Sequence, residues 1–431
     1  MEVPMSPFNT QPSHLESEVA RFPQELGLLR TPANENIEKL TTAQRAHPFL
    51  RALEFLQAGS LSLEMPGNIK LFYKGLKRGP HGHMRFHDWK CLDRLLTSGD
   101  LAWGEDYALG LWETNDISSL MHFVAENAAT LEKFSNGNAV FRFMNRFRRK
   151  LFGNSQARSR FNSHEHYDLG NDFYSLWLDE TMTYSGGLFD GNKTLPLVQA
   201  QKAKYERILD RLKPRPEDHI LEIGCGWGGF MKAASERGAR VTGLTLSEEQ
   251  ALWIEQTLDT KSMETPFRVK LEDYRKVKGK YDHIVSIGTF EHVGEAYWGT
   301  FMKCLHDRLK QKGQAVVQTI TVREDLFDFY RSSTGFIREH IFPGGMLPTT
   351  TRFQEEARKA GFKVLDVYPF GQDYAITLEK WLLNFDRSIE AVRELGYNDT
   401  FIRKWRFYLA YCMAMFRASR ISVMQVHLQK L

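Results

Sequence analysis

A glycine-rich turn stands near the middle of the chain, between a short apolar run and a stretch with helical spacing. The apolar run is 219–223, and Gly224, Gly226 and Gly229 follow it in the pattern G-x-G-x-x-G. Where such a turn joins a strand to a helix, its glycines let the backbone approach a nucleotide closely. The turn therefore predicts a nucleotide site at the carboxyl end of a β-strand.

Strand-like and helix-like segments alternate from residue 216 onward. The predicted strands are 219–223, 240–246, 267–271, 282–287 and 313–320. Helical spacing follows the first two of them, at 230–237 and 248–258. This alternation predicts an α/β fold, a Rossmann-like parallel, doubly wound sheet with helices on both faces.

Length and composition limit the possible classes of protein. A chain of 431 residues predicts two or three domains, and 42% hydrophobic with 26% charged residues is typical of a folded globular protein. The net charge of +4 is too small to indicate a nucleic-acid partner, and we expect none. The four cysteines are scattered, and no His, Cys or Asp cluster has ligand spacing. We therefore expect no disulfides, no metal site and a cytoplasmic location.

The N-terminal third predicts a separate, smaller unit. Residues 1–45 have no sustained period and are interpreted as an arm. Residues 46–137 contain a strand pair around the turn 66–68 and two helical segments, which predicts a small mixed α/β accessory domain. Residues 1–6 have neither the basic region nor the apolar region of a secretory signal, so we expect none. The longest apolar run, 409–416, is far shorter than the roughly 20 residues that cross a bilayer. We expect no membrane-spanning helix.

Residues 138–160 predict a basic amphipathic helix that connects the two units. From Phe141 to Arg160 there are arginines and a lysine but no acidic residue, and apolar residues recur every three or four positions. Such a helix is suited to transient contact with an anionic membrane surface. A solvated linker helix packed on its neighbours explains the same pattern, and both interpretations stay open.

The charges around the glycine turn distinguish between possible cofactors. A dinucleotide enzyme has an acidic residue at the end of the second strand, but this chain has Leu244-Thr-Leu-Ser there. Glu222, just before the first glycine, suits a cationic ligand. Asp273 follows the third strand, where it can accept a hydrogen bond from an adenine amino group. S-adenosylmethionine, a positively charged adenosyl compound, satisfies both conditions.

Several sequence blocks occur in a fixed order in the second part of the chain. They are His164–Tyr174, Met182–Ser185, Leu221–Gly229, Thr242–Gln250, Phe290–Gly294 and Ile341–Gly345. Together they resemble the cyclopropane-fatty-acid synthase family of S-adenosylmethionine-dependent methyltransferases, and Gly104-Glu-Asp-Tyr resembles the accessory domain of its longer members. The resemblance implies a methyltransferase domain at 161–431 that acts on an unsaturated phospholipid acyl chain. It also implies an enzyme peripherally associated with the inner face of the membrane, with a homodimer as one possible assembly.

The resemblance also implies roles for individual residues in cofactor binding. The residues expected around S-adenosylmethionine are Tyr184, Ser185, Gly224 and Gly226 at the methionine end, Thr245 and Gln250 at the ribose, Asp273 with its neighbour Glu272 at the adenine, and Tyr167 closing over the amino acid portion. The segments 155–213 and 330–345 are expected to form a helical lipid-binding cover.

In this family the catalytic base is taken to be a bound bicarbonate. Glu291 and Tyr374 match its carboxylate and tyrosine ligands, and Ile320 matches the residue that supplies a carbonyl. Two further ligands of the family are missing. Gly186 stands where the family has a cysteine, and Gln318 stands where it has a histidine. The amide of Gln318 still donates and accepts hydrogen bonds. Two products therefore stay open: a cyclopropane ring, or a methyl-branched or methylene chain formed without ring closure.

The chemistry of alkene methylation places its own demands on the site. Methylation leaves a carbocation, so the site must exclude water and is favoured by aromatic faces. Candidates for such an aromatic wall are Tyr184, Phe290, Tyr297, Trp298, Tyr330, Phe342 and Tyr374. Three alternatives remain: a small-molecule N-methyltransferase, a lipid-binding protein with an unused cofactor site, and a nicotinamide reductase.

Overall fold

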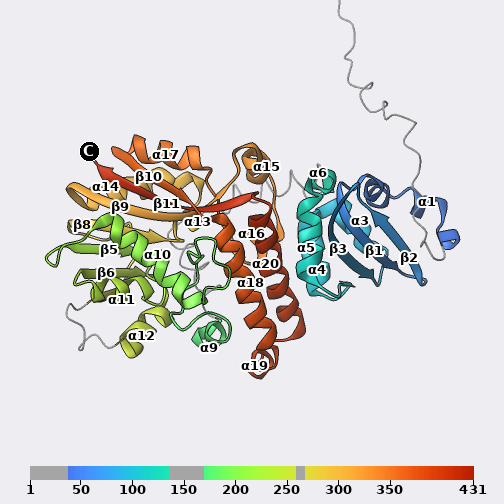
Figure 1. The fold of residues 1–431 in the computed structure, drawn as a ribbon, viewed down its shortest axis with the longest axis horizontal. Helices are drawn as coiled ribbons and strands as arrows, with labels where there is room; N and C mark the ends of the chain where they lie inside the picture. Colours follow the sequence, from blue (N-terminus) through green and yellow to red (C-terminus); the bar gives the residue numbers. More distant parts are fainter. Residues whose placement is uncertain (1–36, 135–168, 259–266) are drawn as a thin grey trace, which may run out of the picture.

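The computed structural model describes residues 37–134, 169–258 and 267–431. Within these ranges a small N-terminal α/β domain lies beside a larger α/β domain (Figure 1). Most of the predicted arm lies outside the described residues, as do Tyr167 and the whole of the predicted basic helix at 138–160. The predictions for these segments stay predictions.

The small domain contains a four-stranded sheet of order β2-β1-β3-β4. β1 pairs antiparallel with β2 and parallel with β3, so the strand pair predicted around residues 66–68 is confirmed, whereas β3 and β4 were not predicted. Its elements are η1 Ile37–Lys39, α1 Thr42–Arg45, α2 Pro48–Ala52, η2 Leu53–Phe55, β1 Ala58–Met65, β2 Ile69–Lys74, β3 Lys77–Phe86, α3 Lys90–Ser98, α4 Asp100–Ala108, β4 Trp112–Glu113, α5 Ile117–Glu126, α6 Ala128–Leu131 and η3 Glu132–Phe134.

The large domain is built on a seven-stranded sheet of order β10-β11-β9-β8-β5-β6-β7. Its elements are α9 Gly170–Ser175, α10 Leu197–Leu212, β5 His219–Ile223, α11 Gly229–Glu236, β6 Arg240–Thr245, α12 Glu248–Thr257, β7 Arg268–Leu271, β8 Tyr281–Ile287, α13 Phe290–Val293, η4 Glu295–Tyr297, α14 Trp298–Arg308, β9 Leu309–Val322, η5 Glu324–Leu326, α15 Phe327–Ser332, α16 Phe336–His340, α17 Thr350–Lys359, β10 Phe362–Pro369, α18 Gly371–Arg387, α19 Ile389–Glu394, α20 Asp399–Arg417 and β11 Ile421–Lys430.

The five strands from β5 to β9 pair in parallel, which confirms the Rossmann-like core. The sheet is not wholly parallel, however, because β11 pairs antiparallel with β9 and β10 pairs antiparallel with β11. In the chain, 98 residues lie between the end of β9 at Val322 and the start of β11 at Ile421, so no local spacing indicates that pairing. The carboxyl ends of the parallel strands face one edge of the sheet, where ligands bind in this class of fold.

Three helices, α16, α18 and α20, lie between the seven-stranded sheet and the small domain (Figure 1). α20 begins after Asn398, whose side chain accepts a hydrogen bond from the Phe401 N–H, and it is apolar over most of its surface because it is buried between the two domains. The expectation that 155–213 roofs the lipid is wrong for α10. That helix packs on α11 and β9, because its apolar stripe faces the sheet.

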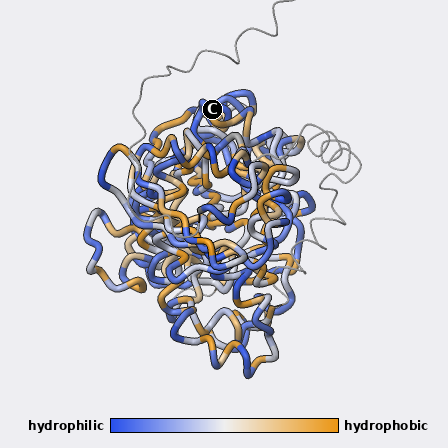
Figure 2. Tube along the Cα trace, turned by 90° about the vertical axis from the view of Figure 1, so that its right-hand side faces the viewer, coloured by the Kyte–Doolittle hydropathy of each residue, from blue (hydrophilic) through white to orange (hydrophobic). Residues whose placement is uncertain are grey.

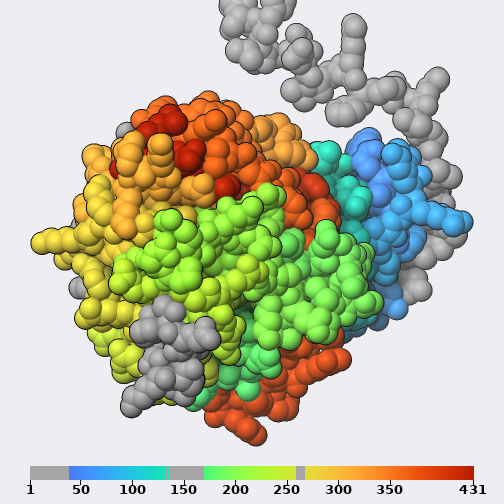
Figure 3. Space-filling view, turned by 60° about the vertical axis from the view of Figure 1, so that its left-hand side comes forward, coloured from blue at the N-terminus to red at the C-terminus, as the bar shows by residue number. Residues whose placement is uncertain are grey.

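The Gly104-Glu-Asp motif of α4 joins the two domains. A Cβ atom at position 104 would lie 2.3 Å from the Phe336 ring of α16, so only glycine allows this approach. The Glu105 carboxylate contacts a side chain of each domain. Its Oε2 lies 3.0 Å from the guanidinium of Arg94 in α3, and its Oε1 lies 3.0 Å from Nε2 of His340 in α16. α4 and α5 also pack against α20. The blue and teal small domain therefore abuts the orange and red C-terminal segments (Figure 3).

Hydrophobic and hydrophilic segments alternate along the trace (Figure 2). None of the described helices combines the length and the apolar character needed to cross a membrane.

Candidate active site

Two cavities meet at the carboxyl ends of the parallel strands. The strand-end pocket, about 210 Å³, follows the ends of β5, β6, β7 and β8. The interdomain cavity, about 300 Å³, extends from β8 and β9 past α16 and α20 to the small domain. Five residues line both cavities and are called the junction: Tyr184, Ser185, Gly288, His292 and Phe342. A ligand in one cavity can therefore reach a ligand in the other.

The glycine turn forms the floor of the strand-end pocket. Gly224 has a φ of 78°, and a Cβ atom there would lie 2.1 Å from the Thr289 hydroxyl oxygen. Gly226 has a φ of 53°, and no atom lies within 4 Å of where its Cβ would be. The N–H groups of Gly224 and Cys225 both donate to the Leu244 carbonyl at 2.9 Å. The turn is thus tied to β6 and leaves open space above Gly226.

Glu222 brings a buried carboxyl group to this pocket. Its side chain is 2% exposed, and Oε2 has no hydrogen-bond partner among the described residues. Burial raises the pKa of Glu222 well above its usual range, and the nearby Lys204 opposes this only partly. A buried acceptor without a partner is costly, and a cationic ligand removes that cost. The pocket therefore fits a ligand with an ammonium or sulfonium group.

Lys204 of α10 is a site residue that the sequence analysis missed. Its Nζ donates to the Ser185 hydroxyl at 2.6 Å and to Gln201 Oε1 at 2.7 Å. Burial lowers the pKa of Lys204 to about 7, although Asp179 and Glu222 oppose the shift. Lys204 falls among the buried residues of α10. A basic residue at a position where the helical spacing is otherwise apolar was the feature of the sequence that could have identified it.

The residues predicted for the ribose and the adenine also line the strand-end pocket. Thr245 Oγ1 donates to Gln250 Oε1 at 2.7 Å. Asp273 is already paired, because the Arg275 guanidinium donates to its two oxygens at 2.9 and 2.6 Å. Burial alone would raise the pKa of Asp273, but Arg275 outweighs it and the pKa is lowered. An adenine amino group would therefore share Asp273 with Arg275, and the adenine role of Asp273 stays a prediction.

Glu291 is an acidic residue of the interdomain cavity that lies beside the junction. Its Oε1 accepts a hydrogen bond from the Ile320 N–H at 2.8 Å, and its Oε2 is buried without a partner among the described residues. Burial raises the pKa of Glu291 to about 7. Its neighbour His292 is neutral, because burial lowers its pKa to about 4. Glu291 can therefore exchange a proton near neutral pH.

The ligand set expected for bicarbonate is incomplete. A Cβ atom at Gly186 would lie 2.7 Å from Cγ of Tyr374, so the Tyr374 ring fills the place where a cysteine side chain would project. That ring is stacked on Phe416, with ring centroids 4.5 Å apart. Gln318 lines the cavity, and its Oε1 accepts from Gln425 Nε2 at 3.1 Å. These residues do not reproduce the expected set, and we derive no step through bicarbonate.

The aromatic wall differs from the predicted one. Tyr184, Tyr330, Phe342 and Tyr374 line the interdomain cavity as expected. The prediction is wrong for Phe290, Tyr297 and Trp298, which pack in the apolar core under β8 and β9, because the turn after β8 directs these rings away from the cavity. α20 supplies Tyr408 instead, and its hydroxyl lies 2.8 Å from that of Tyr184.

A family model described as mycolic acid cyclopropane synthetase matches residues 154–426. The chain belongs to this family. It is 32% identical over 339 residues to the tuberculostearic acid methyltransferase UfaA1 of Mycobacterium tuberculosis, which covers 77% of this chain and 79% of that protein. It is 33% identical to the cyclopropane-fatty-acyl-phospholipid synthase of Escherichia coli K12, with 77% and 84% covered.

Solved structures agree with this assignment. Mycolic acid cyclopropane synthase CmaA1, complexed with SAH and CTAB, superposes with a TM-score of 0.59 at 33% identity, covering 63% of this chain and 98% of that one. The predicted family, fold class and cofactor are thereby confirmed, and the chain is an S-adenosylmethionine-dependent methyltransferase. The nicotinamide reductase and the lipid-binding protein with an unused cofactor site are left without support.

Proposed function

We propose that this enzyme transfers a one-carbon group from S-adenosylmethionine to the double bond of an unsaturated acyl chain on a membrane phospholipid. The observation that carries the proposal is the junction, where an elongated apolar cavity opens directly onto the cofactor pocket. The names of the Escherichia coli and Mycobacterium tuberculosis relatives, a fatty-acyl-phospholipid synthase and a tuberculostearic acid methyltransferase, support an acyl acceptor.

Each part of the site has a role in this reaction. Bound S-adenosylmethionine supplies an electrophilic methyl group, and the glycine turn and Glu222 hold it at the strand ends. The rings of Tyr184, Phe342 and Tyr408 exclude water, and each aromatic face is able to stabilise a nearby cation by about 0.5–2 kcal/mol. Glu291 Oε2 is the available acceptor for the proton that the methylated chain must lose.

A second candidate concerns the product. Gly186 and Gln318 replace two expected anion ligands, and the Tyr374 ring occupies the space beside Gly186. This arrangement favours proton loss without ring closure, which gives a methylene or methyl-branched unsaturated chain. The atoms and charges balance for this outcome and for the cyclopropane, because each product forms by transfer of one methyl group and loss of one proton.

The location of the enzyme is part of the same proposal. A phospholipid acceptor places the enzyme at a membrane surface, and the basic segment at 138–160, outside the described residues, would contact anionic lipid. We propose peripheral association with the inner face of the membrane. A homodimer remains a prediction.

Transfer of labelled methyl groups tests the proposed acceptor. The enzyme is incubated with methyl-labelled cofactor and vesicles of either dioleoyl or distearoyl phospholipid. We expect label in the extracted acyl chains of the dioleoyl lipid alone. Label on an amine, or equal label in both lipids, contradicts the proposal, and label on an amine favours a small-molecule N-methyltransferase.

Proton NMR of the purified product separates the two product candidates. Cyclopropane protons resonate at unusually high field, whereas methylene protons resonate in the olefinic range. We expect the new carbon to give olefinic signals if it is a methylene group or methyl signals if it is a branch, and no cyclopropane signals. A purely cyclopropanated product contradicts the second candidate and leaves the first intact.

A further inference from the structure

The interdomain cavity continues beyond the junction into the core of the small domain. Its walls there come from β1, β3, α3 and α5, and include Leu61, Met84, Leu95, Leu120, Phe123 and Val124. Most of these side chains also belong to the apolar core of the small domain itself. The small domain is therefore partly hollow, and its hollow faces the catalytic domain.

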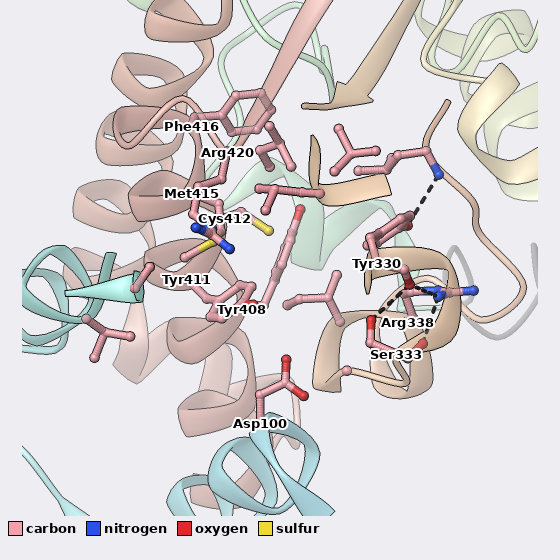
Figure 4. Close-up of a pocket in the computed structure, with 18 of the residues that line it drawn as sticks. Asp100, Tyr330, Ser333, Arg338, Tyr408, Tyr411, Cys412, Met415, Phe416 and Arg420 are labelled. Atoms are coloured by element: carbon pink, nitrogen blue, oxygen red, sulfur yellow. Dashed lines mark hydrogen bonds between the residues drawn. The ribbon is translucent and has the colours of Figure 1, made fainter. Parts of the chain in front are cut away.

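A small polar group lies where the two domains meet. Asp100 of α4 faces Tyr408 and Tyr411 of α20 on one side of the cavity, with Ser333 and Arg338 on the other (Figure 4). Asp100 Oδ1 is buried without a hydrogen-bond partner among the described residues. Burial raises the pKa of Asp100 to about 7, with Tyr411 and Arg338 among the groups that oppose the shift. Asp100 thus lies in the cavity between the Glu291 end and the apolar end in the small domain.

The hollow of the small domain lies outside the catalytic domain that the family model describes. The family model begins at residue 154, and the CmaA1 structure covers 63% of this chain. The small domain ends before residue 154, so its part of the cavity lies outside the residues that the family model matches, although the alignments with the longer relatives extend into it. Its occupant must be apolar, must be elongated and must enter through the same cavity as the acceptor.

We propose that the small domain binds hydrocarbon of the lipid acceptor that is remote from the reacting carbon. This inference rests on the proposed function and adds a second acyl-binding subsite to it. The continuity of the cavity supports it, because Glu291, Asp100, Leu120 and Phe123 all line the same cavity. The docking of Phe336 on Gly104 holds the two parts of the cavity in register.

The test fills the small-domain end of the cavity with a larger side chain. Val124→Trp adds an indole ring at a half-buried cavity position of α5. We expect the full-length enzyme to bind dioleoyl phospholipid about tenfold more weakly, the loss of roughly two buried methylene groups. Its affinity for S-adenosylmethionine should be unchanged. The matched control is Leu76→Trp, because Leu76 is 77% exposed at another point of the same domain.

Two lipid arms identify which hydrocarbon occupies the subsite. Weaker binding of both monoacyl and diacyl phospholipid supports the far end of the reacting chain as the occupant. Weaker binding of diacyl lipid alone supports the companion chain. Unchanged binding of both lipids by a folded Val124→Trp variant overturns the inference.

Two further measures keep the test decisive. If Val124→Trp does not fold, Val124→Phe adds less volume at the same place, and unchanged lipid binding by that folded variant also overturns the inference. Because lipid binding is measured without methyl transfer, a failure of the proposed reaction is distinguished from a failure of the subsite.

Discussion

The strand-end pocket and the interdomain cavity are assembled in opposite ways. The strand-end pocket takes most of its walls from one continuous stretch of chain around β5 to β8, and its key groups are glycines and charged side chains. The interdomain cavity takes its walls from both domains and from helices more than 200 residues apart in the chain, and they are mostly apolar. Short-range sequence patterns define where the cofactor binds, whereas long-range packing defines the acceptor site.

The largest effect is expected from Glu291→Gln in the interdomain cavity. The amide cannot accept the proton that the methylated chain must lose, so turnover should fall by about 10²- to 10⁴-fold while cofactor affinity is kept. Methyl incorporation and calorimetric titration measure the two quantities. Glu295→Gln, close by in the chain and paired with Arg331, is the control. Near-normal turnover of Glu291→Gln would contradict the role of Glu291 as the proton acceptor of the interdomain cavity.

Glu222→Gln should affect the strand-end pocket alone. It removes the buried carboxyl group whose Oε2 has no hydrogen-bond partner among the described residues, so binding of S-adenosylmethionine should weaken by about 1.5–3 kcal/mol, or roughly ten- to a hundredfold. Titration calorimetry measures the change, and the exposed Glu217→Gln is the control. If Glu222→Gln weakens lipid binding instead, the assignment of the cofactor to the strand-end pocket and of the lipid to the interdomain cavity is contradicted.

The pH dependence of turnover should follow Glu291. Burial raises its pKa to about 7, so the carboxyl group is protonated below that pH and cannot act as a base. We expect kcat/KM to rise about tenfold per pH unit below about 7 and to level off above it. In Glu291→Gln the residual kcat/KM should no longer rise with pH below about 7. A flat wild-type profile between about pH 6 and 8 argues against Glu291 as the base.

The cofactor pocket was more predictable from the sequence than the acceptor cavity. Gly224 and Glu222, predicted to bind the cofactor, both line the strand-end pocket, and their signal lies within a few positions of one strand end. The contact between Gly186 and Tyr374 joins residues 188 positions apart, and no periodicity indicates it. Phe290 was misplaced because a motif does not show which way a ring turns after a strand. Small-domain residues such as Leu120 looked like ordinary core in the sequence.

The smallest effect is expected from Gly186→Ala. Its methyl group would press on the Tyr374 ring, and overpacking of this kind costs about 1–3 kcal/mol of unfolding free energy. Chemical denaturation measures the loss. Gly299→Ala, on the helix α14 with only an ordinary contact to Glu356, should cost nothing. Equal stability of the two variants would mean that the Tyr374 ring moves freely, and the acceptor cavity would then be less rigid than the strand-end pocket.

Carbon NMR of the lipid formed from ¹³C-methyl cofactor and dioleoyl phospholipid tests the central claim most directly, namely that the donor and a hydrocarbon acceptor meet at the junction of Tyr184, Ser185 and Phe342. The account predicts that the labelled carbon is bonded to a carbon atom of the former double bond. A labelled carbon bonded to a headgroup nitrogen, or the absence of label from the lipid, would contradict it.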